Sequence, residues 1–150
     1  MSARIDIGEA DFDAGAEIEA LKARTGDAGA IATFTGYVRG GAGLKSMRLE
    51  HYPAMTEREI ARHVAEAERR WPLLGVTVIH RIGRLAPGER IVFVGVASAH
   101  RAAAFEACEF IIDYLKVRAP FWKEEERQDG PRWVEAKPGD DQAAARWKKS

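Results

Sequence analysis

The chain has 150 residues, of which 46% are hydrophobic and 31% are charged, a composition typical of a globular domain that argues against disorder. Lysine plus arginine equals aspartate plus glutamate at 23 each, so no overall positive charge favours binding to nucleic acid or to an anionic membrane. The length suits a single domain over residues 1–150, and the lack of a signal-like N-terminus or of a long apolar stretch predicts a cytoplasmic protein.

The first quarter of the chain predicts a strand, a helix and a second strand. Residues 4–7 read as a short strand, and Asp13 can cap a helix that Gly26 ends. Residues 30–38 are rich in β-branched and aromatic side chains and predict a strand. The glycine-rich stretch 40–43 cannot hold a regular element without a large loss of backbone entropy, so we expect a mobile loop there, and such loops often line functional sites.

The next segment predicts a strand followed by an amphipathic helix. Residues 47–52 form the strand, which Pro53 ends, and Thr56 with Glu59 matches a capping box at the start of the helix. Apolar side chains then recur at helical spacing up to Pro72, namely Ile60, Val64, Ala67 and Trp71.

Two strands and the longest helix occupy the centre of the chain. Residues 76–82 and 90–98 read as strands that pair antiparallel, because residues 83–89 between them contain the turn signal Pro87-Gly88. Ser98 can cap a helix over residues 101–118, and Pro120 ends it.

The C-terminal part predicts a hairpin and a short helix. Residues 121–127 and 132–134 flank Asp129-Gly130, a turn signal, and Asp140 can start a helix that reaches Trp147. Strands outnumber helices and short turns join most of them, so we expect an α+β domain with a mixed, largely antiparallel sheet and flanking helices. Neither a GxGxxG nor a GxxxxGK[ST] motif is present, which weakens a nucleotide-binding interpretation.

The helix over residues 101–118 carries the most informative pattern. At about 100° per residue, Lys116 lies about 20° around the helix from Phe105, so the pattern places a lysine at the end of an apolar stripe that also contains Cys108 and Ile112. Either the lysine stem packs while its ammonium reaches water, or the amine has a function. The turn at Ala119-Pro120 can bring Lys123 towards Lys116, and converging cations disfavour protonated amines, which would make one lysine a better proton carrier or nucleophile.

An anion site is predicted at the start of the same helix. The free backbone N–H groups and the positive end of the helix dipole favour an anion such as phosphate beside His100 and Arg101, although His100 can also merely decorate the helix entry. His80-Arg81 is a similar dipeptide within a strand, and we assign it to structure.

Cysteine and histidine usage argues against thiol and metal chemistry. The only cysteine, Cys108, lies on the apolar stripe, so we expect a buried side chain with a raised thiol pKa and a poor sulfur carrier. A single cysteine also excludes an internal disulfide and a cysteine-rich zinc site, and any sulfur that the protein handles must come from elsewhere. His51 and His63 lack spaced carboxylate or thiol partners, so we expect no metal and no cofactor.

A series of short motifs, running in order from residue 31 to residue 147, resembles the large (catalytic) subunit of molybdopterin synthases. Each motif is weak alone, but the ordered series is specific. The motifs are Phe34-Thr35-Gly36-Tyr37-Val38-Arg39, Leu49-Glu50-His51-Tyr52-Pro53-Ala54-Met55, His80-Arg81-Ile82-Gly83, Ser98-Ala99-His100-Arg101, Asp113-Tyr114-Leu115-Lys116, Ala119-Pro120-Phe121-Trp122-Lys123-Glu124 and Arg132-Trp133-Val134-Glu135-Ala136.

The resemblance implies a hammerhead-like α+β fold and a homodimer within a heterotetramer that includes two small ubiquitin-like sulfur-carrier subunits. The small subunits insert their Gly-Gly C-termini, which carry thiocarboxylates. It also implies a sulfurtransferase of molybdenum cofactor biosynthesis that converts cyclic pyranopterin monophosphate into the dithiolene of molybdopterin.

The resemblance also implies site residues. Lys116 matches the principal catalytic lysine, and Lys123 matches a second active-site lysine. The positions that bind the anion and the pterin, some of them across the dimer interface, match Arg39, His100 and Arg101. Four further positions, Tyr37, Val38, Glu124 and Glu125, match the lining of the same pocket. Lys137 stands where the family often has arginine, which would keep the charge but lose a bidentate phosphate contact, and the 40–43 loop is shorter than usual.

Two other interpretations compete with this one. A non-catalytic module that docks a ubiquitin-like tail and a phosphorylated ligand would use the same arginines but would tolerate replacement of Lys116. General nucleic-acid binding would require a steep salt dependence of affinity, and the zero net charge disfavours it.

Overall fold

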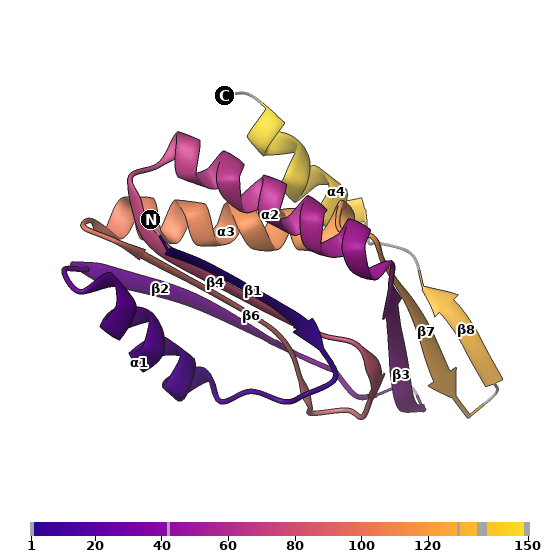
Figure 1. The fold of residues 1–150 in the computed structure, drawn as a ribbon. Helices are drawn as coiled ribbons and strands as arrows, with labels where there is room; N and C mark the ends of the chain where they lie inside the picture. Colours follow the sequence, from indigo (N-terminus) through magenta and orange to yellow (C-terminus); the bar gives the residue numbers. More distant parts are fainter. Residues whose placement is uncertain (1, 42, 129, 135–137, 149–150) are drawn as a thin grey trace.

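The computed structural model describes residues 2–41, 43–128, 130–134 and 138–148. Helices and strands alternate irregularly along the chain (Figure 1). The elements are, in order, β1 (Ser2–Gly8), α1 (Ala14–Thr25), β2 (Ala30–Tyr37), β3 (Leu44–His51), α2 (Pro53–Arg70), β4 (Leu73–Arg81), β5 (Gly83–Leu85), β6 (Arg90–Ser98), α3 (Arg101–Val117), β7 (Phe121–Arg127), β8 (Gly130–Val134), α4 (Pro138–Ala145) and a 3-10 turn (Arg146–Lys148).

The described strands form two sheets of four strands each. The first sheet has the order β1-β4-β6-β2, in which β1 runs parallel to β4 and the other pairs are antiparallel. The second has the order β5-β3-β7-β8 and is antiparallel throughout. The α+β class, the antiparallel β4–β6 pair and the β7–β8 hairpin are confirmed, but the strands divide between two sheets, whereas we expected one.

The short strand β5 accounts for part of this difference. Residues 83–89 were predicted as a simple turn, yet Gly83–Leu85 pairs with Leu49–Met47 of β3 and forms an edge of the second sheet. A three-residue strand that begins at a glycine with φ of +83° carries too little periodicity to be recognised from sequence.

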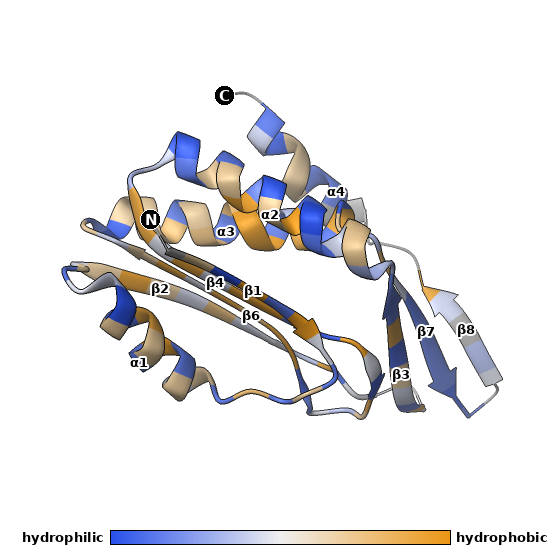
Figure 2. Ribbon diagram, viewed as in Figure 1, coloured by the Kyte–Doolittle hydropathy of each residue, from blue (hydrophilic) through white to orange (hydrophobic). Residues whose placement is uncertain are grey.

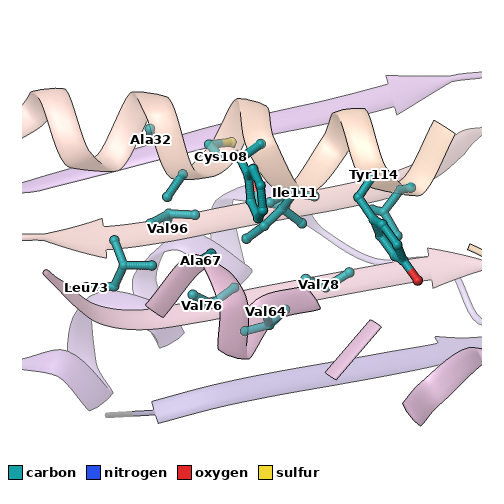
Figure 3. Close-up of a cluster of buried hydrophobic side chains, with 14 of the residues drawn as sticks. Ala32, Val64, Ala67, Leu73, Val76, Val78, Val96, Cys108, Ile111 and Tyr114 are labelled. Atoms are coloured by element: carbon teal, nitrogen blue, oxygen red, sulfur yellow. Dashed lines mark hydrogen bonds between the residues drawn. The ribbon is translucent and has the colours of Figure 1, made fainter. Parts of the chain in front are cut away.

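Helices cover both faces of the first sheet (Figure 1). Alternation along β4 sends Val76 and Val78 into the large core beneath α2 and α3, and Ile79 into a smaller core with Phe12 and Phe93 beside α1. Figure 2 shows the central strands as largely hydrophobic and β7 as hydrophilic. Figure 3 shows the main core, in which Cys108, Ile111 and Tyr114 of α3 project towards the strands. The second sheet therefore lies beside the main hydrophobic core and is more polar than the first sheet.

The helix starts differ from two of our predictions. Helix α2 begins at Pro53, with Tyr52 as N-cap, so Thr56 lies inside the first turns, fully buried, and the predicted Thr56–Glu59 capping box is wrong. Proline fits the first helical position because its missing N–H would be unpaired there anyway. The predicted N-cap Asp13 is confirmed, because its side chain accepts a hydrogen bond from the backbone N–H of Ala16.

Ser98 is not the cap of α3, because His100 occupies that position. The Ser98 hydroxyl donates to the Pro72 carbonyl oxygen at 2.8 Å and accepts from the backbone N–H of His100 at 3.3 Å. Its side chain thus holds the segment before α3 against the end of α2. Helix α4 also begins earlier than expected, at Pro138 in place of Asp140.

Gly29 fixes the position of the same segment from the other side. Its N–H donates to the Ser98 carbonyl oxygen at 3.0 Å, and a Cβ at this position would lie 2.1 Å from the carbonyl oxygen of Ala99. We therefore expect Gly29→Ala to lower the free energy of unfolding by about 2 to 4 kcal/mol, measured by urea denaturation. The control is Gly8→Ala, where a Cβ meets nothing within 4 Å and the cost should stay below about 1 kcal/mol. Equal stability of the two variants would contradict this account.

Candidate functional site

Helix α3 separates the predicted site residues into two groups. His100 is its N-cap, Arg101 is its first residue and Lys116 lies in its last turn, and all three side chains are exposed. With a rise of about 1.5 Å per residue, Lys116 lies about 22 to 24 Å along the helix axis from Arg101 and His100. One chain therefore does not bring the predicted anion site and the predicted catalytic lysine together.

The apolar stripe that we predicted on α3 is wrong in its orientation. Phe105 is 66% exposed, Ile112 is half-buried and Lys116 is exposed, whereas Cys108 is buried. The face that packs on the sheet is centred elsewhere because small alanines allow close approach. Its buried residues are Ala103, Ala104, Ala107, Cys108, Phe110, Ile111, Tyr114 and Leu115. Lys116 thus does not face the core, and the argument for a functional role of Lys116 depends on the residues around the end of α3.

Those neighbours gather where the two sheets meet. The ring of Phe121, the first residue of β7, stacks on the ring of His80 from β4, with centroids 3.9 Å apart, and lies 6.0 Å from the ring of His51. Lys116 precedes Phe121 by five positions in the chain, and its positive charge contributes to lowering the pKa of the buried His80. The three rings of His51, His80 and Phe121 thus connect the two sheets.

Lys123 lies on the same side of the second sheet as Phe121. It is half-buried and pairs with Leu49 of β3 and Val134 of β8. Because strand side chains alternate, Lys123 shares a face with Phe121, whereas Trp122 points to the opposite face. The short turn after α3 joins the two lysine-bearing elements, and the convergence of the two amines stays a prediction.

Glu124 and Glu125 project from opposite faces of β7. Glu125 shares the face of Lys123 and pairs with Arg127 at 2.6 Å. Glu124 lines a hollow of about 480 Å³ on the other face, together with Arg48 of β3 and Arg84 of β5. Of these two glutamates, Glu125 is the one that shares a sheet face with Lys123.

Tyr37, at the end of β2, and the next two residues, Val38 and Arg39, have different environments. Tyr37 is 53% exposed and Arg39 is exposed, but the side chain of Val38 is buried with Met47, Leu49 and Leu85. The backbone of Val38 donates to Glu89 O and accepts from Gly88 N–H. Val38 therefore offers neither its side chain nor an unpaired backbone group to the surface.

His80 is a residue whose position where the two sheets meet the sequence did not reveal. The dipeptide His80-Arg81 was assigned to structure, which holds for Arg81: its buried guanidinium donates to Glu9 O and Arg90 O and pairs with Glu89. His80 is 8% exposed, and burial, with a contribution from Lys116, lowers its pKa to about 4. A pattern of two polar residues in a strand gives no sign that one of them contacts a distant strand.

The environment of Cys108 confirms the prediction for its thiol. The side chain is buried, and burial raises the thiol pKa to about 12. We expect no reaction of Cys108 with Ellman's reagent in the folded protein over an hour, and rapid reaction in 6 M guanidinium, followed by absorbance. A Cys108→Ala variant should keep full activity, and a large loss without loss of stability would implicate the thiol in chemistry.

The described residues contain no group of three histidine, cysteine or carboxylate side chains arranged to hold a metal. His63 instead stacks on Tyr114, with centroids 3.8 Å apart, and burial lowers its pKa to about 4. Lys137 lies outside the described residues. Over the same part of the chain, no helix is both long and apolar enough to cross a lipid bilayer.

Comparison with known proteins gives one consistent result. The family model described as "MoaE protein" matches residues 7–118. The chain is similar to the molybdopterin synthase catalytic subunit of Pseudomonas aeruginosa, at 56% identity over 95% of this chain and 97% of the relative. It is similar to that of Salmonella typhimurium at 57% identity over 96% and 97%. A solved structure of the molybdopterin biosynthesis MoaE protein from Burkholderia ambifaria matches with a TM-score of 0.85, 50% identity and 99% coverage of both chains.

Proposed function

The chain belongs to the MoaE family, the catalytic subunits of molybdopterin synthase, and we propose that it moves sulfur from a small protein's C-terminal thiocarboxylate onto cyclic pyranopterin monophosphate. As a family member it is an enzyme of molybdenum cofactor biosynthesis. The observations that support the finer proposal are the short turn that joins the helix of Lys116 to the strand of Lys123, and the burial of the only thiol of the chain.

The thiol chemistry supports sulfur import. A residue that carried sulfur as a persulfide would need an accessible thiolate, and Cys108 has neither accessibility nor a low pKa. A thiocarboxylate on a partner's C-terminal Gly-Gly supplies the nucleophilic sulfur directly. A Gly-Gly tail is narrow because glycine lacks a side chain, so it can enter a tight pocket. In this proposal the tail ends beside Lys116.

The chemistry assigned to each group follows from its charge. His100 and Arg101, at the positive end of α3, together with Arg39, would hold the phosphate of the pterin. As the sulfur forms its bond to a carbon of the pterin side chain, the oxygen on that carbon would leave with a proton that Lys116 supplies. The acyl–sulfur bond would then break by attack of the Lys116 amine or of water on the acyl carbon. Water then releases the small subunit as a carboxylate, and a second small subunit supplies the second sulfur.

The length of α3 makes a second copy part of this proposal. Within one chain the phosphate-binding end and Lys116 are about 22 to 24 Å apart, so a pocket that uses both would take Lys116 from one protomer and His100 with Arg101 from its partner. Phe105, which is 66% exposed on α3, offers apolar surface for such a contact. Two small subunits bound to this dimer would complete a heterotetramer.

One assay tests the proposed function. The purified chain is mixed with a thiocarboxylated small subunit and cyclic pyranopterin monophosphate, and the products are measured by mass spectrometry. We expect a pterin product with two added sulfurs and a small subunit that ends in a carboxylate. Failure to form dithiolene, with both partners bound, would refute the reaction.

A further inference from the structure

The Ser98 hydroxyl makes two hydrogen bonds at once in the backbone just before α3. It donates to the Pro72 carbonyl oxygen at 2.8 Å and accepts from the backbone N–H of His100 at 3.3 Å. A hydroxyl can fill both roles because it carries one hydrogen and two lone pairs. The side chain is fully buried, so water does not compete for either bond. Ser98 therefore joins the residue that precedes β4 to the N-cap of α3.

The backbone that carries this hydroxyl is itself fixed on both sides. Ser98 ends β6, which lies between β4 and β2, and its register partners on those strands are Leu73 and Ala30. The Ser98 carbonyl oxygen accepts from the Gly29 N–H at 3.0 Å, and the missing side chain of Gly29 leaves room for the Ala99 carbonyl group. The hydroxyl thus projects from the interior of the first sheet, where backbone movement is restricted.

This use of the hydroxyl leaves the first turn of α3 open to a ligand. A serine close to a helix start commonly caps the helix by accepting from N–H groups of the first turn. Here the Ser98 oxygen accepts from His100 instead, and the side chain of His100, the N-cap, makes no capping hydrogen bond in the described part of the chain. The N–H groups at the positive end of α3 can then donate to an anion, beside the exposed side chains of His100 and Arg101.

We propose that Ser98 is a positioning residue, which sets the backbone direction at His100 and thereby aims the start of α3 at the phosphate of the pterin. This inference rests on the proposed function and adds to it a residue that does not touch the substrate. Pro72 provides the fixed end of the support, since its ring restricts φ, and the hydrogen bond from His100 extends that support to the helix start. Binding groups need to be held within about 0.5 Å, so a shift of the N-cap should weaken all the phosphate contacts together.

Removal of the hydroxyl should weaken binding of the pterin without slowing the chemical step. In Ser98→Ala, we expect KM for cyclic pyranopterin monophosphate to rise about tenfold or more, with kcat within about twofold. The reason is that the phosphate contacts are equally strong in the substrate complex and in the transition state. A purely structural role predicts the opposite split, because a smaller folded fraction lowers the apparent kcat and leaves KM unchanged.

Thr77→Val is the matched control. It removes another fully buried hydroxyl from the first sheet, one that accepts from the Arg24 guanidinium at 2.7 Å. Thr77 alternates with Val76 and Val78, so its side chain lies on the face of the sheet away from α3. Its loss should lower stability to a similar extent as Ser98→Ala but leave KM within about twofold. An equal rise of KM in both variants would show that general destabilisation, and not positioning, weakens binding.

Two further variants keep the test sharp. Ser98→Thr retains the hydroxyl but adds a methyl group at a fully buried position, so stability should fall while KM stays within about threefold of wild type. If Ser98→Ala does not fold, Ser98→Cys replaces it, because a thiol has a similar shape but is a weak donor and acceptor, and the same rise of KM is expected.

Binding is also measured without turnover, by calorimetry with cyclic pyranopterin monophosphate and the chain bound to a small subunit that ends in a carboxylate. We expect the same loss of affinity in Ser98→Ala as its rise in KM. Absence of binding and of product in the wild type would overturn the proposed function, and this inference with it. An active wild type beside a folded Ser98→Ala variant of unchanged affinity would overturn the assignment of Ser98 alone.

Discussion

Replacing Lys116 with alanine should abolish formation of the dithiolene, with a fall in kcat on the order of a thousandfold or more, while the protein stays folded. The side chain is exposed in the last turn of α3, so its removal leaves no cavity and exposes no buried charge. The expected loss therefore comes from chemistry, because proton transfer and nucleophilic catalysis by a positioned amine each contribute factors of this size.

The measurement is single-turnover formation of product, followed by mass spectrometry, with a thermal melt of each variant. The matched control is Lys45→Ala, which removes an exposed lysine from β3 and should leave kcat within about twofold. Retained activity in the Lys116 variant would remove this residue from its role. It would also favour the interpretation as a binding module, in which the arginines hold ligands and no lysine acts.

Mixing two inactive variants should restore activity if each pocket uses residues of two chains. Lys116→Ala and Arg101→Ala homodimers would each carry two defective pockets. In a heterodimer of the two, one pocket collects both defects and the other has an intact Lys116 from one protomer and an intact Arg101 from its partner. Random pairing at equal amounts then gives about a quarter of the wild-type activity per chain.

This experiment uses co-expression of the two variants with different affinity tags, followed by purification of the doubly tagged species. The doubly tagged dimer should show about half of the wild-type activity, since one of its two pockets is intact. A control dimer of two differently tagged Lys116→Ala chains should stay inactive. If the mixed dimer stays inactive, Lys116 and Arg101 of one protomer act in the same pocket. That result would contradict the argument from the length of α3.

The order and type of the main elements could be predicted from the sequence because each has a local signal. The β-branched residues of 30–38, the turn at Pro87-Gly88 and the proline at 120 mark β2, the β4–β6 hairpin and the end of α3, and the structure confirms all three. The start of α2 was missed because a proline at the first helical position competes with a capping-box pattern three residues later.

The environment of the site residues was less predictable, because it depends on contacts between distant segments. A helical wheel placed Lys116 beside Phe105 and Cys108 as an apolar stripe, but the alanines at 103, 104 and 107 shift the packed face of α3 and leave Phe105 exposed. The stacking of His80 on Phe121 joins residues 41 positions apart on different sheets, and no local pattern encodes such a contact. The resemblance supplied the roles, and the structure confirms the unbroken helix that separates His100 and Arg101 from Lys116.

If the two ends of α3 serve different pockets, the unbroken helix couples those pockets mechanically. A helix of 17 residues behaves as a stiff rod, so a displacement of Arg101 along the axis as it closes on a phosphate moves Lys116 by a similar amount. Occupancy of one pocket would then alter the geometry of the neighbouring one. Two successive sulfur additions at paired pockets would in that case communicate, and binding of the pterin should depart from that of two independent sites.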